Sequence, residues 1–175
     1  DGGAVASFTC GTVDIGDRFR IISRRKDMTV NIGGTADIYV DGDMRISENG
    51  GRKDYTECLV NMDGGTENAN RINIFDDEAE NGSIAIVNLS GGLMIARERF
   101  EIPNRGDGSA TVSITGGVMQ LGDIVLNDAD SVIDVNGPLG DHGDGVIILD
   151  GNKSATIGGY VSEGTITGAG SSWGV

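Results

Sequence analysis

The acidic side chains of four short stretches are the groups in this sequence best suited to chemistry. The stretches are "DGD" (41–43), "FDDEAE" (75–80), "NDAD" (127–130) and "DHGDGVIILDG" (141–151). Calcium prefers carboxylate and carbonyl oxygens, which Asp-rich turns supply. One hypothesis is therefore a calcium site built from Asp128, Asp130, Asp141 and Asp144. The alternative is that these are solvated turns, because none of the stretches matches an EF-hand loop.

A carboxylate-based hydrolase would need acidic and basic groups gathered on one exposed face. The candidates for such a set are Asp123, Asp134, Arg97, Arg99 and Arg105. No spacing in the sequence groups them, and His142, the only histidine, has no nucleophile or second ligand near it. No phosphate-binding glycine loop is present either. We therefore expect no enzyme activity and no cofactor other than calcium.

Two kinds of covalent modification remain open. The tripeptide N-x-[ST] that accepts glycans occurs at Asn81, Asn88 and Asn152. Cys10 and Cys58 are the only cysteines, so they either form one disulfide in an oxidising compartment or remain two buried thiols.

Composition excludes several classes of partner. The chain has 175 residues, enough for one domain, with 13 basic and 27 acidic residues and a formal net charge of −14. Such a charge opposes binding to nucleic acid or to an anionic membrane. The longest strongly apolar run, "GVIIL" (145–149), is too short to span a bilayer, so no membrane insertion is expected. The first residues lack the pattern of a signal peptide, which fits either a cleaved product or a fragment.

A short motif that ends in two glycines recurs along the chain. Its copies are "MTVNIGG" (28–34), "CLVNMDGG" (58–65), "IVNLSGG" (86–92) and "ATVSITGG" (110–117), with "SVIDVNGP" (131–138) as a degenerate fifth. In each copy two apolar residues flank one polar residue, which is the period of a half-buried strand. The second glycines fall at 34, 65, 92 and 117, so the spacing shortens from 31 to 27 to 25 residues.

This spacing predicts a β-solenoid. A unit of about 20–30 residues holds about three short strands and cannot bury its apolar face alone, so successive copies must stack. We expect an all-β, single-domain β-solenoid of about five coils over residues 1–149, with a short C-terminal capping segment and tail over 150–175. Within that segment we expect a helical turn and then a strand over 165–167. The alternative is a β-sandwich with glycine-rich hairpins, which does not explain the whole-copy repeat.

Several segments resemble the glycine-rich β-solenoid repeats of secreted and surface bacterial proteins, of the autotransporter-like or PEP-CTERM-associated type. They are "GTVDIGDRFRI" (11–21), "GDMRISENGG" (42–51), "GSATVSITGGVMQLGDIVL" (108–126) and "GVIILDGNKSATIGGYVSEGTITGAG" (145–170). The resemblance implies a structural protein and carries no catalytic residues. The charged insertions over 47–57 and 75–82 depart from the pattern, and no sorting tail follows Trp173.

The ends of a solenoid expose unpaired backbone groups, which soluble proteins must cover. "DGGAVASFTC" (1–10) leads into strand at once, so we expect an open N-terminal end, and the tail "GAGSSWGV" (168–175) is either an added strand or disordered. The leading hypothesis is an extracellular or cell-surface structural protein that forms a homo-oligomer or filament by end-to-end contact. The alternative is a monomeric, calcium-dependent glycan-binding or adhesion module.

Overall fold

The computed structural model describes residues 3–21, 27–47, 57–75, 83–102, 108–128, 130–135, 145–151, 154–162 and 166–167. Its elements in chain order are β1 (Ala4–Ile15), β2 (Phe19–Ile21), β3 (Met28–Ile46), β4 (Glu57–Ile74), β5 (Ile84–Ile102), β6 (Ser109–Leu121), β7 (Ile124–Leu126), β8 (Val132–Val135), β9 (Val146–Leu149), α1 (Ser154–Ser162) and β10 (Ile166–Thr167). In this part of the chain no helix is both long and apolar enough to cross a bilayer.

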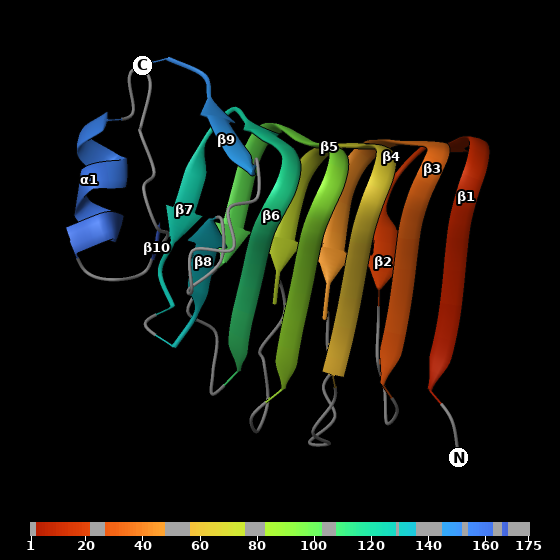
Figure 1. The fold of residues 1–175 in the computed structure, drawn as a ribbon, viewed down its shortest axis with the longest axis horizontal. Coiled ribbons are helices and arrows are strands. Elements are labelled where there is room, and N and C mark those ends of the chain that lie inside the picture. Colours follow the sequence, from red (N-terminus) through yellow and green to blue (C-terminus); the bar gives the residue numbers. More distant parts are fainter. Residues whose placement is uncertain are drawn as a thin grey trace.

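The strands form one column in which every pairing is parallel. The order is β1-β3-β4-β5-β6-β8-β10, while β2 pairs with β3, β7 with β5 and β9 with β6. The long strands lie side by side, with β1 at one end of the column and α1 at the other (Figure 1). Hairpins of a β-sandwich would be antiparallel, so the β-solenoid is confirmed. It has about four turns, where the repeats suggested about five.

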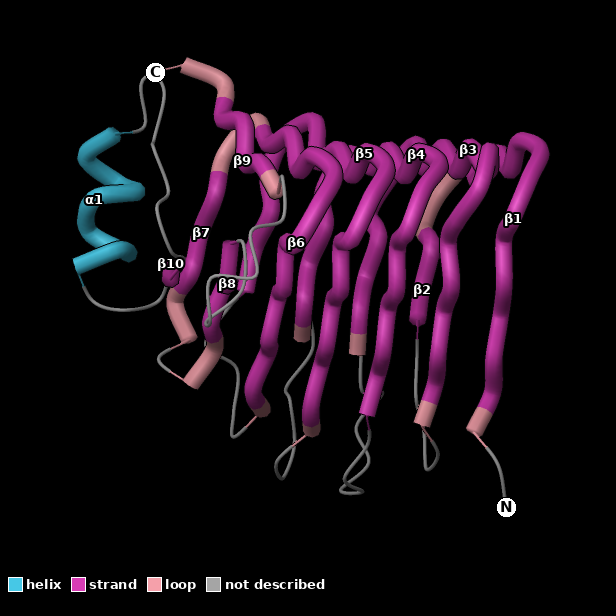
Figure 2. The backbone as a smooth tube through the Cα atoms, in the orientation of Figure 1, coloured by secondary structure: helices cyan, strands magenta, loops and turns pink. Residues whose placement is uncertain are grey.

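Each complete turn has three strand segments, which we call the first, second and third faces. The backbone tube bends sharply where one segment passes into the next (Figure 2). The first face comprises residues 4–8, 28–32, 58–62, 84–89, 109–114, 132–135 and 166–167. The second comprises 12–15, 37–40, 66–69, 93–96, 118–121 and 146–149. The third comprises 19–21, 43–46, 71–74, 99–102 and 124–126.

Equivalent residues of successive turns stack directly on one another, as the repeat predicts. Ile32 pairs with Met62, Met62 with Leu89, and Leu89 with Ile114, and all four side chains are buried. The alternation of inward apolar and outward polar residues continues on all three faces. The inward side chains therefore form one mainly apolar core along the inside of the column.

The paired glycines form the corner between the first and second faces. The second glycine of each pair has positive φ: 59° at Gly34, 73° at Gly65, 81° at Gly92 and 76° at Gly117. L-residues with a side chain avoid this conformation. The backbone of the previous turn also lies close, so that a Cβ on Gly92 would come within 2.7 Å of the Gly64 carbonyl. Glycine is needed here for both reasons.

The C-terminal segment covers part of the column's end. Ile157 of α1 is buried against the core, and the Tyr160 hydroxyl accepts a hydrogen bond of 3.1 Å from the Leu126 N–H of β7. The strand expected over 165–167 is present as β10, which pairs with β8. These contacts place α1 over the third face and β10 over the first.

Candidate functional site

Asp128, one of the four expected calcium ligands, belongs to the turn between β7 and β8. Its Oδ1 accepts a hydrogen bond of 3.1 Å from the Asp130 N–H, and its Oδ2 accepts one from the Ser131 hydroxyl. The Ser131 hydroxyl oxygen in turn accepts the Ala110 N–H at 2.8 Å. Asp128 is buried, whereas Asp130 is exposed. Both carboxylate oxygens of Asp128 are thus engaged in shaping the turn.

The other two expected ligands, Asp141 and Asp144, lie outside the described residues, as does His142. Within the described ranges, no group of three or more His, Cys, Asp or Glu side chains is arranged to hold a metal ion. Of the four expected calcium ligands, the structure therefore describes only Asp128 and Asp130.

The hydrolase-like set is divided among the faces. Asp134 lies on the first face in β8, where its Oδ1 accepts the Thr167 hydroxyl at 3.4 Å. Arg99 lies on the third face and Arg97 at the corner before it. Asp123 precedes β7, and Arg105 lies outside the described residues. Asp134 and Arg99 therefore lie on different faces of the column.

The two cysteines are not joined. Cys10 is exposed in β1, and Cys58 is buried in β4, where its thiol lies 3.9 Å from the Ile21 carbonyl oxygen. The alternative of two buried thiols is thus wrong for Cys10, since only Cys58 lies in the core.

A ladder of asparagine side chains runs along the outside of the first face. Asn88 donates to Asn61 Oδ1 at 2.9 Å, Asn61 to Asn31 Oδ1 at 3.0 Å, and Asn31 to the Ser7 hydroxyl at 3.4 Å. Stacked amides of this kind stiffen parallel, in-register strands. Asn88 is the one glycan acceptor in the described part of the chain, and a glycan on its nitrogen would replace one of the two N–H groups there; Asn81 and Asn152 lie outside the described residues.

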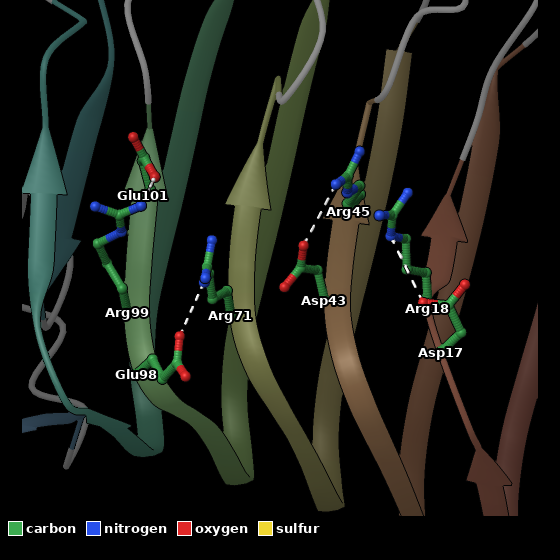
Figure 3. Close-up of polar contacts among 8 residues, drawn as sticks. All are labelled: Asp17, Arg18, Asp43, Arg45, Arg71, Glu98, Arg99 and Glu101. Atoms are coloured by element: carbon green, nitrogen blue, oxygen red, sulfur yellow. Dashed lines mark hydrogen bonds and ion pairs between the residues drawn. The ribbon is translucent and has the colours of Figure 1, made fainter.

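Ion pairs run along the third face (Figure 3). They join Asp17 to Arg18 at 3.7 Å, Asp43 to Arg45 at 3.3 Å, Arg71 to Glu98 at 3.0 Å and Arg99 to Glu101 at 2.9 Å. The hydrogen bond from Arg71 lowers the pKa of Glu98 below its usual value, and the same bond raises the pKa of Arg71. Each of these four arginines is therefore paired with a carboxylate, which offsets its positive charge on this face.

Arg97 ties three turns together at the corner between the second and third faces. Its guanidinium donates to Asn68 Oδ1 at 2.8 Å in β4 and to the Val40 and Asp41 carbonyl oxygens at 2.8 and 3.2 Å in β3. It also lies over the Tyr39 ring, 4.7 Å from the centroid. A planar guanidinium with several fixed donors suits such a bridge. The contacts of Arg97 in the structure thus hold turns of the column together.

Glu67 is a carboxyl group inside the core, which the sequence reasoning missed. It stacks between Ile38 and Met94 on the second face, is 0% exposed, and neither oxygen has a hydrogen bond of normal geometry. Burial raises the pKa of Glu67 to about 8, against smaller opposing effects of the Asn68 backbone and the Arg97 charge. A usable signal existed: Glu67 follows Gly65 as Met94 follows Gly92. No substrate reaches this group, so its effect is on stability.

The edge of β1 is the largest unpaired backbone surface in the described part of the chain. β1 pairs with β3 on one side, and no described strand lies on its other side. Four of its inward side chains, Ala6, Phe8, Val13 and Ile15, are only partly buried, whereas their partners on β3 are buried. The turn formed by β1 and β2 therefore exposes apolar side chains at this end of the column. Among them, the rings of Phe8 and Phe19 pack edge-on, with their centroids 6.1 Å apart.

Comparison of the chain with protein-family models, with curated proteins and with solved structures finds no match. The candidate site is accordingly defined by its geometry alone, and it is the exposed edge of β1.

Proposed function

We propose that this chain is a non-enzymatic structural protein of the cell exterior that associates with a second copy of itself through the edge of β1. The observation that carries the proposal is this unpaired, apolar edge at one end of the column. An open parallel edge of this length is a template for another strand, and soluble proteins either cover it or use it.

The backbone of β1 has free groups to offer. The Ala4 N–H donates to the Asp27 carbonyl oxygen of the neighbouring turn at 3.0 Å. Because the direction of N–H and C=O alternates along a strand, Val5 and Ser7 direct theirs toward the uncovered side. Val5 is also 68% exposed. The first face of β1 can therefore accept one more strand without any rearrangement of β3.

Charge favours a second copy at this place and not elsewhere on the surface. The chain carries a net charge of −14, so two copies repel one another over most of their surface. Residues 3–13, however, contain no charged side chain. Edge strands that must stay single are usually protected by charged residues or proline; β1 has no proline, and its one charged residue, Asp14, lies near its C-terminal end.

The geometry favours a closed pair over a filament. Head-to-tail stacking needs both ends of the column open, but α1 and β10 cover two of the three faces at the C-terminal end. Two like ends joined by a two-fold axis form a dimer that does not grow further.

The exterior location rests on the acidic composition and the resemblance to surface repeats. The described residues hold no observation that favours the calcium-dependent glycan-binding alternative.

A proline at Val5 tests the pairing. Val5→Pro removes an N–H on the uncovered side and leaves the Ala4 bond to β3 in place, so the fold should persist while pairing fails. Sedimentation equilibrium should give a dimer for the unsubstituted protein and a monomer for Val5→Pro, with unchanged circular dichroism. Val5→Ala is the matched control, because it loses the side chain but keeps the N–H, and it should remain dimeric. A monomeric unsubstituted protein, or regular filaments in negative stain, would contradict the proposal.

A further inference from the structure

The second-face part of β4, residues 66–69, buries fewer apolar side chains than its counterparts in the other turns. We call these residues the Glu67 segment. Its two inward side chains are Glu67 and Ala69, and both are 0% exposed. The neighbouring turns place Ile38 and Met94 at the position of Glu67. Every other described part of the second face has two apolar side chains packed against the core. Because burial of apolar surface holds the turns closed, the Glu67 segment is held less firmly than the equivalent residues of β3 and β5.

The pairing of β4 with both of its neighbours is irregular on either side of the Glu67 segment. In the ladder with β5 the register shifts between Met62 and Thr66, and again between Ala69 and Arg71. The ladder with β3 shifts at the same two places. The Glu67 segment is thus a unit of four paired residues with irregular backbone at both ends. Such a unit can leave the stack while the first and third faces of the same strand remain paired.

On its outer side the Glu67 segment is tied to both neighbours through Arg97. This guanidinium donates to Asn68 Oδ1 at 2.8 Å and, in the same position, to the Val40 carbonyl oxygen of β3 at 2.8 Å. Asn68 faces outward because the residues on either side of it face inward. The backbone of the sheet therefore lies between the Arg97 guanidinium and the Glu67 carboxyl group, and neither Glu67 oxygen has a hydrogen bond of normal geometry.

The other charged groups around the Glu67 segment do not share its place in the core. They occupy outward or corner positions: Asp37, Asp41 and Asp43 on β3, Asp63 and Arg71 on β4, and Glu98 on β5. The other ionisable side chain that points into the core of this turn is the Cys58 thiol, on the first face of β4. Of all these groups, Arg97 is the one whose charge acts on Glu67, and its effect is smaller than that of burial.

We propose that the Glu67 segment is a pH-sensitive flap, which leaves the column when Glu67 loses its proton while the first and third faces of β4 stay paired. An ionised carboxylate without a partner is costly in an apolar core, and opening brings it into water. Opening breaks four residue pairs on each side and the bond from Arg97, but the segment itself exposes only one apolar side chain, that of Ala69. It therefore costs less than unfolding of the whole column. This inference goes beyond the proposed function and does not depend on the pairing of β1.

The direction of the pH effect follows from the two environments of Glu67. Burial raises the pKa of Glu67 to about 8 in the closed column, whereas the ordinary value of 4.5 applies once the segment is open. Between these values the open state has released a proton that the closed state still holds, so the open population rises about tenfold for each pH unit. Above about pH 8 Glu67 is ionised in both states, and the open population becomes constant.

Two buried thiols on the same turn test the flap. In a protein carrying Cys10→Ser, Cys58 reports on the first face. Adding Cys58→Ala and Ala69→Cys moves the reporter to the Glu67 segment, and both positions are 0% exposed. The rate of labelling by a thiol reagent is divided at each pH by the rate for the same protein unfolded in urea. For Ala69→Cys this ratio should rise about tenfold per pH unit up to about pH 8 and then level off. Cys58, which is exposed only when the whole column unfolds, should be labelled at least about tenfold more slowly at every pH.

Glu67→Gln is the matched control, because its side chain cannot ionise, and it should remove the rise with pH. Hydrogen exchange of the unsubstituted protein guards against an effect of the new cysteine: amides 66–69 should be less protected than amides 58–62, and their protection should fall with pH in the same way. Equal labelling of the two thiols together with equal protection of the two sets of amides would show that the column opens only as a whole, and would overturn the flap. A rise with pH that persists in Glu67→Gln would overturn the role of Glu67.

Discussion

Gly92→Ala is expected to destabilise the solenoid by about 2–5 kcal/mol, because two penalties add. The first is conformational: Gly92 has φ 81°, and an L-residue there costs about 1–2 kcal/mol. The second is steric, since the new Cβ would lie 2.7 Å from the Gly64 carbonyl carbon and oxygen and from the Gly65 oxygen. These are backbone atoms held in the ladder, so they cannot move aside as a flexible side chain would.

Two other glycines separate these penalties. Gly11 has φ 83°, but no atom lies within 4 Å of a Cβ placed on it, so Gly11→Ala should cost only the conformational part. Gly16 has neither constraint, and Gly16→Ala should change stability by less than about 1 kcal/mol. Urea unfolding followed by circular dichroism should rank the losses as Gly92, then Gly11, then Gly16. An equal loss at Gly92 and Gly11 would show that the turns do not approach closely at this corner.

Glu67 is expected to make the stability of the protein depend strongly on pH. The pKa of Glu67 is about 8 in the folded protein against 4.5 as the ordinary value, so between these limits the folded state holds a proton that the unfolded state has released. The contribution of Glu67 to stability is therefore greatest below pH 4.5 and is lost as the pH rises through about 8. A shift of this size corresponds to about 5 kcal/mol over the whole window.

Replacement of Glu67 isolates this contribution. Glu67→Gln keeps a polar side chain but cannot ionise, so its stability should lack the decline that the unsubstituted protein shows. Glu67→Met introduces at this position the same residue as its paired neighbour, Met94. The free energy of unfolding of this variant should exceed that of the unsubstituted protein, and the difference should be largest at alkaline pH. Other titrating groups, such as His142, are common to all three proteins and cancel in the differences. Parallel pH profiles of unfolding free energy for the unsubstituted protein and Glu67→Gln would contradict the assignment.

Much of the fold could be predicted from the sequence because the repeat carries it directly. The alternation of Val60, Asn61 and Met62 marks inward and outward positions, and the paired glycines mark the corner. Because this pattern recurs in four copies, stacking the copies places equivalent residues next to one another. The structure accordingly has a ladder of asparagines on the outside of the first face. It also has a row of buried apolar residues on the inside, formed by Ile32, Met62, Leu89 and Ile114. The uncovered edge of β1 follows from the same reasoning.

The side-chain roles were less predictable, because they depend on contacts between turns. Asp128 has the chemistry of a calcium ligand, but one of its carboxylate oxygens accepts a hydrogen bond from the Ser131 hydroxyl within the turn. The amino-acid composition of the turn does not predict this bond. Arg97 donates to carbonyl oxygens more than fifty residues earlier in the chain, and that contact exists only after the turns stack. Glu67 was not predicted for another reason: a carboxyl group at an inward strand position departs from the apolar pattern that marks the core.

The account depends on the in-register stacking of equivalent residues, and a pair of engineered cysteines tests it most directly. In a protein carrying Cys10→Ser and Cys58→Ala, the substitutions Asn61→Cys and Asn88→Cys place two thiols on directly paired residues, whose Cα atoms lie about 4.8 Å apart, within disulfide range. Moving the second cysteine to Ile86 offsets the pair by two residues, about 7 Å along the strand and out of that range. In-register stacking predicts rapid oxidation of the first pair within one folded chain and none of the second. Equal oxidation of both pairs, or of the offset pair alone, would contradict it.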